Sequence, residues 1–110
     1  MNTREKTYRS GGNVFADIGL AHPERVMARA QVMLRITAII RERGLTQKEA
    51  AQVLGIPQSK VSCLMAGKLS LFSLDRLFQF LNALDREIEI VIRPSATTGR
   101  SAMTHVVMTV

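Results

Sequence analysis

The sequence predicts a mainly α fold, a small bundle of about five helices followed by one C-terminal β-strand. Hydrophobic residues make up 46% of the 110 residues, but aromatic residues make up only 5%, and Trp is absent. A core of Leu, Ile, Val, Met and Ala favours a compact helical domain of this length. Apolar residues also recur at helical spacing through most of the chain, and they alternate at strand spacing only near its C-terminal end.

Three regions are expected along the chain. Residues 1–13 are polar and rich in glycine near their end, so we expect a flexible arm. Residues 14–94 are expected to form the folded domain, and residues 95–110 a tail. The stretch NVFADIGL, residues 13–20, has the apolar spacing of one helical turn, and we expect that turn to cap the core.

A long helix is predicted to start at His22-Pro23-Glu24. Pro loses no hydrogen bond at the first helical position, and Glu is stabilised by the positive end of the helix dipole. Gly44 is expected to end this helix in the left-handed conformation. The expected apolar stripe is Val26, Ala30, Met33, Thr37 and Ile40, flanked by Met27, Leu34, Ile36 and Ile39.

Two short helices are predicted next. Thr46 and Glu49 have the spacing of a capping box, in which each side chain accepts a hydrogen bond from the backbone N–H of the other residue. Gly55 ends the first short helix, Pro57 suits the first turn of the second, and Gly67 ends the second. The residues expected to be buried on the two helices are Ala50, Ala51, Leu54, Val61, Leu64 and Met65.

A last helix begins after Ser73, which is a suitable N-cap. Its predicted apolar stripe is Leu74, Leu77, Phe78, Leu81 and Leu84. The period then changes, because Ile88, Ile90 and Ile92 alternate within EIEIVIR, and Pro94 closes the run. This alternation predicts a β-strand over residues 87–93.

The predicted strand needs a partner, because an unpaired strand leaves its backbone groups without hydrogen bonds. One candidate is the tail segment THVVMTV, residues 104–110. The other is the same strand of a second subunit, paired antiparallel about a two-fold axis. We favour the second subunit, and we therefore predict a homodimer formed through Ile88, Ile90 and Ile92.

The two short helices have the layout of a helix-turn-helix. Small residues at Ala50 and Ala51 allow close approach, Gly55 permits a positive φ, and Ile56 can fill the angle between the helices. The segment resembles the XRE (Cro/C1-type) helix-turn-helix family at Thr46-Gln47, Glu49, Ala51, Leu54-Gly55-Ile56, Val61-Ser62, Leu64 and Gly67. The resemblance implies a lambda repressor-like fold, binding to double-stranded operator DNA and repression of transcription.

The order of segments around this motif is similar to the HigA-like antitoxin branch of that family. The segments are NVFADIGL, the long first helix, RERGLTQKEAAQVLGI, SLFSLDRL and EIEIVIRP. This resemblance implies that the protein binds a RelE-fold mRNA-cleaving toxin and represses its own operon. Two alternatives stay open: a stand-alone phage-type or housekeeping repressor without a toxin, and a protein-interaction module that has lost DNA binding.

The resemblance also assigns roles to side chains of the helix-turn-helix. At about 100° per residue, a second helix with Val61 and Leu64 inside turns its other faces outward. The expected base-reading residues are Gln58, Ser59, Ser62 and Cys63, and Gln58 can pair with adenine through two hydrogen bonds. The expected phosphate contacts are Gln47, Lys48, Lys60 and Lys68. The alternative for Gln47, Ser59, Lys48 and Lys68 is a solvated surface, and for Cys63 an inert small residue.

Composition bounds the remaining classes. Fifteen Lys and Arg against nine Asp and Glu give a net charge of +6, which suits either an anionic partner or a soluble basic domain. The one cysteine permits no intrachain disulfide and favours a reducing compartment. No apolar run approaches the roughly 20 residues of a membrane span, and the N-terminus lacks the apolar core of a secretory signal, so we expect a cytoplasmic protein without membrane contact.

The sequence shows no pattern of an enzyme. It contains neither a pair of catalytic carboxylates nor a glycine-rich phosphate loop, and His22 and His105 lie far apart without further metal-ligand residues nearby. We therefore expect no catalytic activity, no cofactor and no bound metal.

Overall fold

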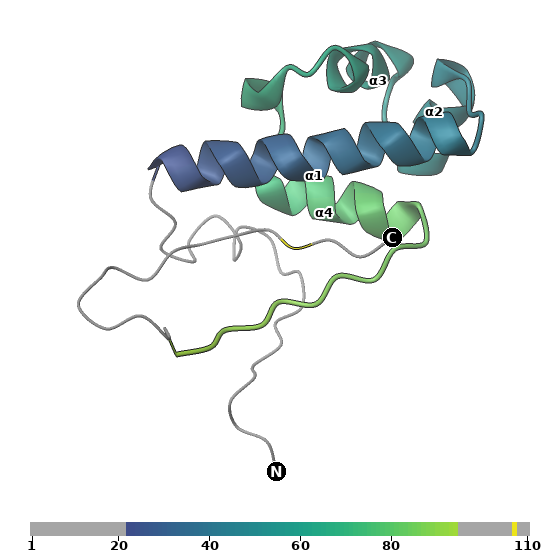
Figure 1. Cartoon of the computed structure of the whole chain (residues 1–110). Helices are drawn as coiled ribbons and strands as arrows, with labels where there is room; N and C mark the ends of the chain where they lie inside the picture. Colours follow the sequence, from purple (N-terminus) through teal and green to yellow (C-terminus); the bar gives the residue numbers. More distant parts are fainter. Residues whose placement is uncertain (1–21, 95–106, 108–110) are drawn as a thin grey trace.

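The computed structural model describes residues 22–94 and residue 107. The described chain folds into α1 (His22–Glu42), α2 (Gln47–Leu54), α3 (Gln58–Met65), the short 3-10 helix η2 (Leu69–Leu71) and α4 (Leu74–Ala83). Helix α1 is the central element: α4 packs along one side of it and α3 lies on the other side, while α2 lies near its C-terminal end and contacts α3 and α4 (Figure 1). The prediction of a mainly helical bundle is confirmed.

The core lies between α1, α4 and the inner faces of the two short helices. Its buried apolar residues are Val32, Met33, Ile36, Ile39, Ile40, Ala50, Leu54, Val61, Leu64, Phe72, Leu77, Phe80, Leu81 and Leu84. The helical spacing predicted most of these positions. Phe80 was missed, because it lies at the edge of the α4 stripe and is buried by an edge-to-face contact with Phe72, which the sequence pattern of α4 does not contain.

Two of the apolar residues expected to flank the α1 stripe do not join the core. The side chains of Met27 and Leu34 are 60% and 68% exposed. The buried side of α1 is instead defined by Ala28, Val32 and Ile36, which recur at four-residue spacing. Ala30, which was expected in the stripe itself, is half-buried and lies outside the core as well. The predicted stripe was too broad because α1 carries apolar residues on two opposite sides.

The four α-helices end in the same way. After each one, an N–H bonds to the carbonyl five residues earlier, and a residue with positive φ precedes that N–H, as in a Schellman motif. Gly44, Gly55 and Gly67 have positive φ at the first three ends, as predicted. The fourth end has Asp85 at φ 63°, the one non-glycine residue with positive φ in the described part of the chain.

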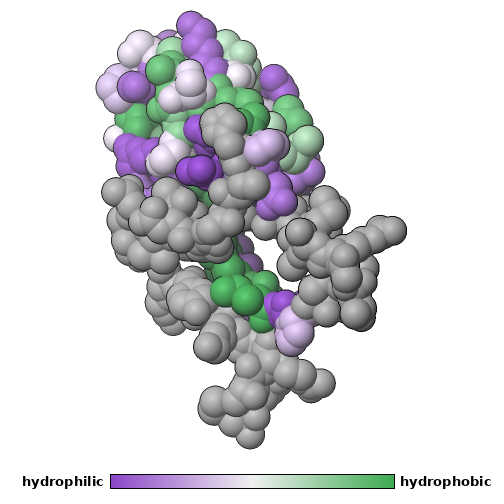
Figure 2. Space-filling view, turned by 90° about the vertical axis from the view of Figure 1, so that its left-hand side faces the viewer, coloured by the Kyte–Doolittle hydropathy of each residue, from purple (hydrophilic) through white to green (hydrophobic). Residues whose placement is uncertain are grey.

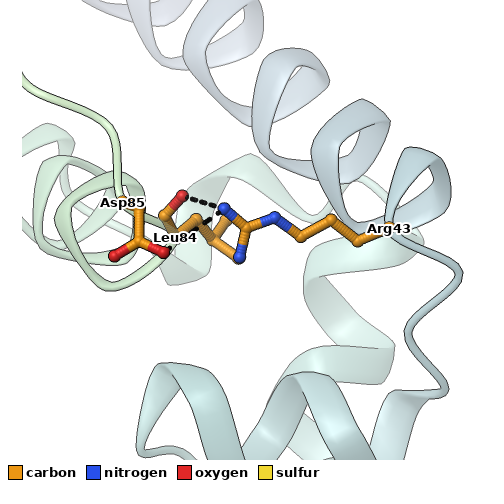
Figure 3. Close-up of polar contacts among 3 residues, drawn as sticks. All are labelled: Arg43, Leu84 and Asp85. Carbon is orange, nitrogen blue, oxygen red and sulfur yellow. Dashed lines mark hydrogen bonds and ion pairs between the residues drawn. The ribbon is translucent and has the colours of Figure 1, made fainter.

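Arg43 joins the end of α1 to the end of α4. Its guanidinium donates a hydrogen bond to the Leu84 carbonyl and lies 3.6 Å from the Asp85 carboxylate (Figure 3). The side chains of Arg43 and Asp85 are 35% and 87% exposed, so water screens their attraction and the hydrogen bond is the stronger contact. The Leu84 carbonyl is one of the groups that a helix end leaves without an intrahelical partner.

The described residues contain no β-strand. The chain after Asp85 runs as an elongated segment away from α4 (Figure 1), and its apolar residues form a green run outside the helical body (Figure 2). Ile88 packs against the core, whereas Ile92 is exposed. The strand over 87–93 therefore stays a prediction. A β-strand is defined by hydrogen bonds to a neighbouring strand, and a single chain without such a neighbour does not form them.

Other predictions fall on residues outside the described part. These are the arm over 1–13, the helical turn within 13–20, and the tail over 95–110 apart from Val107. The described part accordingly contains four α-helices and one 3-10 turn, and the predicted number of about five helices is not confirmed.

A candidate nucleic-acid interface

The first helix of the motif is opened by the predicted capping box. The Glu49 N–H donates to Thr46 Oγ1 at 3.1 Å, and Glu49 Oε1 accepts from the Thr46 N–H at 2.9 Å. The Thr46 backbone N–H, followed by its hydroxyl, lowers the pKa of the Glu49 carboxyl below its ordinary value of 4.5. Gln47 and Lys48, two of the predicted phosphate contacts, are exposed in this first turn.

The turn between α2 and α3 sets the angle of the second helix. Gly55 has φ 69° and ψ 34°, which is the left-handed conformation expected of it. Ile56 is half-buried and packs against the core, as the layout predicted. Pro57 lies one residue before α3 rather than in its first turn, and its carbonyl accepts from the N–H groups of Lys60 and Val61 at 2.9 and 3.2 Å.

Helix α3 is divided sharply between an inner and an outer face. Val61 and Leu64 are completely buried, while Gln58, Ser59 and Ser62 are exposed. This arrangement places three of the four predicted base-reading side chains on the outer surface. The one charged side chain of α3, Lys60, is exposed, and α3 has no acidic residue that would repel a polyanion.

Cys63 differs from the expectation that it faces outward. It is half-buried and packs against the core beside Leu64. At 100° per residue, it lies on the flank between the two faces of α3, and a small apolar side chain is accommodated there by the core. The exposed surface of α3 is therefore narrower than predicted.

The cations near α3 are organised by aromatic rings. The Lys60 ammonium lies 5.9 Å from the centre of the Phe72 ring, and the Arg76 guanidinium lies 5.0 Å from the centre of the Phe80 ring. The two rings meet edge to face with their centres 5.9 Å apart. This row of two adjoining rings with a cation at each end connects α3 to the start of α4, where Arg76 also donates to Gln79 Oε1 at 2.7 Å.

Arg76 is a further cation at the edge of this surface, and the sequence pattern did not predict it. The available signal was its position four residues before Phe80, a spacing that places a cation over a ring on one helix face. Lys48 and Lys68, in contrast, are exposed as predicted, and no contact with an acidic side chain is recorded for them within the described residues. The motif thus combines a nearly uncharged outer face of α3 with cations at its edges.

Residues 14–93 match the family model of a helix-turn-helix domain. Among solved structures, a "Putative XRE Family Transcriptional Regulator" is 38% identical to this chain, with a TM-score of 0.77. The match covers 81% of this chain and 100% of that chain. This protein belongs to the XRE-type helix-turn-helix family. No curated protein matches the sequence.

The XRE-type motif carries most of the predicted DNA contacts on its surface. Gln47, Lys48, Gln58, Ser59 and Ser62 all lie exposed on α2 and α3. In the same described part, no helix is long and apolar enough to cross a membrane. Nor do three side chains of His, Cys, Asp or Glu gather there as metal ligands.

Proposed function

We propose that this XRE-type protein is a sequence-specific DNA-binding transcriptional regulator that inserts α3 into the major groove. The observation that carries the proposal is the division of α3, which has a completely buried inner face and an outer face of short polar side chains. A helix held by its inner face alone can protrude into a groove about 12 Å wide. Its outer side chains are donors and acceptors that suit the edges of bases.

Individual roles follow from side-chain chemistry. Gln58 can form two hydrogen bonds with adenine, whereas Ser59 and Ser62 can contact either kind of base. Gln47, Lys48 and Lys68 are exposed at the edges of the motif and would contact phosphates, as would Lys60, which lies over the Phe72 ring. Because α3 carries a single formal charge, affinity should depend on two half-sites and on Arg residues elsewhere.

The test is binding of the purified protein to the DNA upstream of its own gene, followed by fluorescence anisotropy over a range of salt concentrations. Gln58→Ala should reduce affinity by about 1–3 kcal/mol and relax the preference at one base pair. Lys60→Ala should weaken binding to all sequences alike and reduce the salt slope by about one. Gln52→Ala, an exposed Gln at the far end of α2, is the matched control. Unchanged binding in the first two variants would refute the assignment.

We infer further that the regulator is the antitoxin and autorepressor of a type II toxin-antitoxin pair. The support is the HigA-like order of segments, which continues through EIEIVIRP to residue 94. The partner would be a RelE-fold mRNA-cleaving toxin. Co-expression with the product of a short neighbouring gene should give a stable complex and relieve that product's toxicity. The absence of such a gene beside this one would favour the stand-alone repressor.

The third possibility, a protein-interaction module without DNA binding, is separated by the same anisotropy measurement. Salt-sensitive binding to the protein's own upstream DNA would exclude it. Binding that is absent at low salt, where phosphate contacts are strongest, would support it instead.

A homodimer through residues 87–93 is part of the same proposal. Two recognition helices must lie about 34 Å apart to enter successive major grooves, and this requires two subunits. Ile90 is the most informative position, since Ile88 already packs against the core of its own chain. Sedimentation of Ile90→Lys should show loss of that dimer, and an unaltered dimer would refute the pairing.

A further inference from the structure

Helix α1 has an exposed apolar stripe that neither the core nor the DNA-binding motif uses. Met27 and Leu34 are seven residues apart, so two turns of helix place them on the same side. They are the most exposed large apolar side chains on the described helices, at 60% and 68%. Ala30 and Ala38 lie on the same side at helical spacing and are half-buried. We call Met27, Ala30, Leu34 and Ala38 the outer α1 stripe.

We propose that the outer α1 stripe pairs with the same stripe of a second copy of this chain, antiparallel about a two-fold axis. An axis between positions 30 and 31 places each Met27 opposite the partner's Leu34. This register gives each exposed apolar side chain an apolar partner, and it places the small Ala30 near the axis, where helices approach most closely. The inference is independent of DNA binding.

Charge complementarity supports this register. Glu24 and Arg35 lie on the same flank of α1, about 20° apart around the helix axis at 100° per residue. In an antiparallel pair about a two-fold axis, the same flanks of the two helices face each other. Two residues lie at the same height when their numbers add up to the same total as Met27 and Leu34, and Glu24 and Arg35 nearly meet this condition. Each Glu24 therefore comes beside the partner's Arg35, twice per dimer. The two helix dipoles are also antiparallel in this arrangement.

The outer α1 stripe is a secondary contact. One pair of helices buries less than the roughly 800 Å² per partner of a stable complex. It therefore adds to another interface between the same chains or joins two dimers, rather than holding a dimer by itself. Its detection requires a measurement that captures a weak contact.

Disulfide crosslinking in the full-length chain provides such a measurement. In a Cys63→Ser background, the double variant Met27→Cys with Leu34→Cys should form covalent dimers under mild oxidation. Positions 27 and 34 of one helix are about 10 Å apart along its axis, beyond the roughly 7 Å that a disulfide can span. Any disulfide in this variant therefore joins two chains.

The two single variants are the matched controls. In the proposed register, position 27 lies about 10 Å along the axis from the partner's position 27, so Met27→Cys alone and Leu34→Cys alone should crosslink far more slowly. Equal crosslinking of single and double variants would indicate random collision and would overturn the proposal. Absence of crosslinking in the double variant, with helical circular dichroism retained, would also overturn it.

A charge exchange tests the register independently. Glu24→Arg or Arg35→Glu alone should slow the crosslinking of the double-cysteine variant by about tenfold, because each change makes two contacts repulsive. The two changes together should restore the rate. No restoration would mean that Glu24 does not lie beside the partner's Arg35, and the antiparallel register would be wrong.

Discussion

Helices α1 and α4 pack along each other in one core, yet they present different surfaces to solvent. Helix α4 has its apolar residues on one side and Arg76, Gln79 and Asn82 outside. Helix α1 has completely buried residues such as Ile36 inside and Leu34 outside. The inner faces of both helices bury apolar side chains in the core. The difference shows that α1 carries more apolar surface than the core of one chain requires.

The largest expected effect would show that the two inner faces are equivalent. Ile36→Ala on α1 and Leu77→Ala on α4 each remove a completely buried side chain and leave a cavity. Each should lower the free energy of unfolding by about 2–5 kcal/mol, as measured by urea denaturation. A loss below 1 kcal/mol for one of them would mean that the core collapses around that site.

The outer face of α1 should respond very differently. Leu34→Ala removes a side chain that is 68% exposed, so the free energy of unfolding should change by no more than about 0.5 kcal/mol. The measurement belongs at low protein concentration, where self-association does not add to stability. A loss comparable to that of Ile36→Ala would show that Leu34 is covered within its own chain.

The contact between the two helix ends should have an effect smaller than that of the core residues and larger than that of Leu34. Arg43→Ala removes the hydrogen bond to the Leu84 carbonyl and should cost about 1 kcal/mol, because that bond is charge-assisted but only half-buried. Arg41→Ala, which removes an exposed Arg from the last turn of α1, is the control. Equal effects would mean that the loss arises from the helix dipole rather than from the contact with α4.

The end of α4 offers a smaller and opposite effect. Asp85 holds a positive φ that costs about 1 kcal/mol in a residue with a side chain, and its ion pair with Arg43 is worth little at 87% exposure. Asp85→Gly should therefore raise the free energy of unfolding by about 0.5 kcal/mol. Asp85→Val should lower it, because a β-branched residue fits this conformation poorly. Destabilisation by Gly would show that the carboxylate contributes more than its exposure suggests.

The last prediction concerns the capping box of α2, the helix that contacts both α3 and α4. The folded state lowers the pKa of Glu49, so its contribution to stability is present above the ordinary pKa of 4.5 and is lost as pH falls through the folded value. The stability difference between wild type and Glu49→Gln should therefore be greatest at neutral pH and vanish in acid. A difference that does not change with pH would contradict the charged hydrogen bond.

Short-range patterns in the sequence determined the helix boundaries, the capping box, the turn at Gly55 and the inner face of α3. Each depends on residues within one or two turns, where hydrogen bonding and φ preferences act locally. The exposure of Gln58, Ser59 and Ser62 on the outer face of α3 was predictable for the same reason. Cys63 was not, because a residue on a helix flank is assigned to one face or the other by the neighbouring elements.

Only the tertiary structure decided which of two apolar sides of α1 is buried, why Phe80 is inside, and that Lys60 and Arg76 lie over rings. These outcomes depend on contacts between elements far apart in the chain, such as Lys60 with Phe72 or Arg43 with Leu84. Local periodicity cannot choose between two faces that are both apolar, since the choice is made by the shape of the neighbouring helix. The alternation of Ile88, Ile90 and Ile92 predicts a strand, but a strand forms only when another backbone lies beside it.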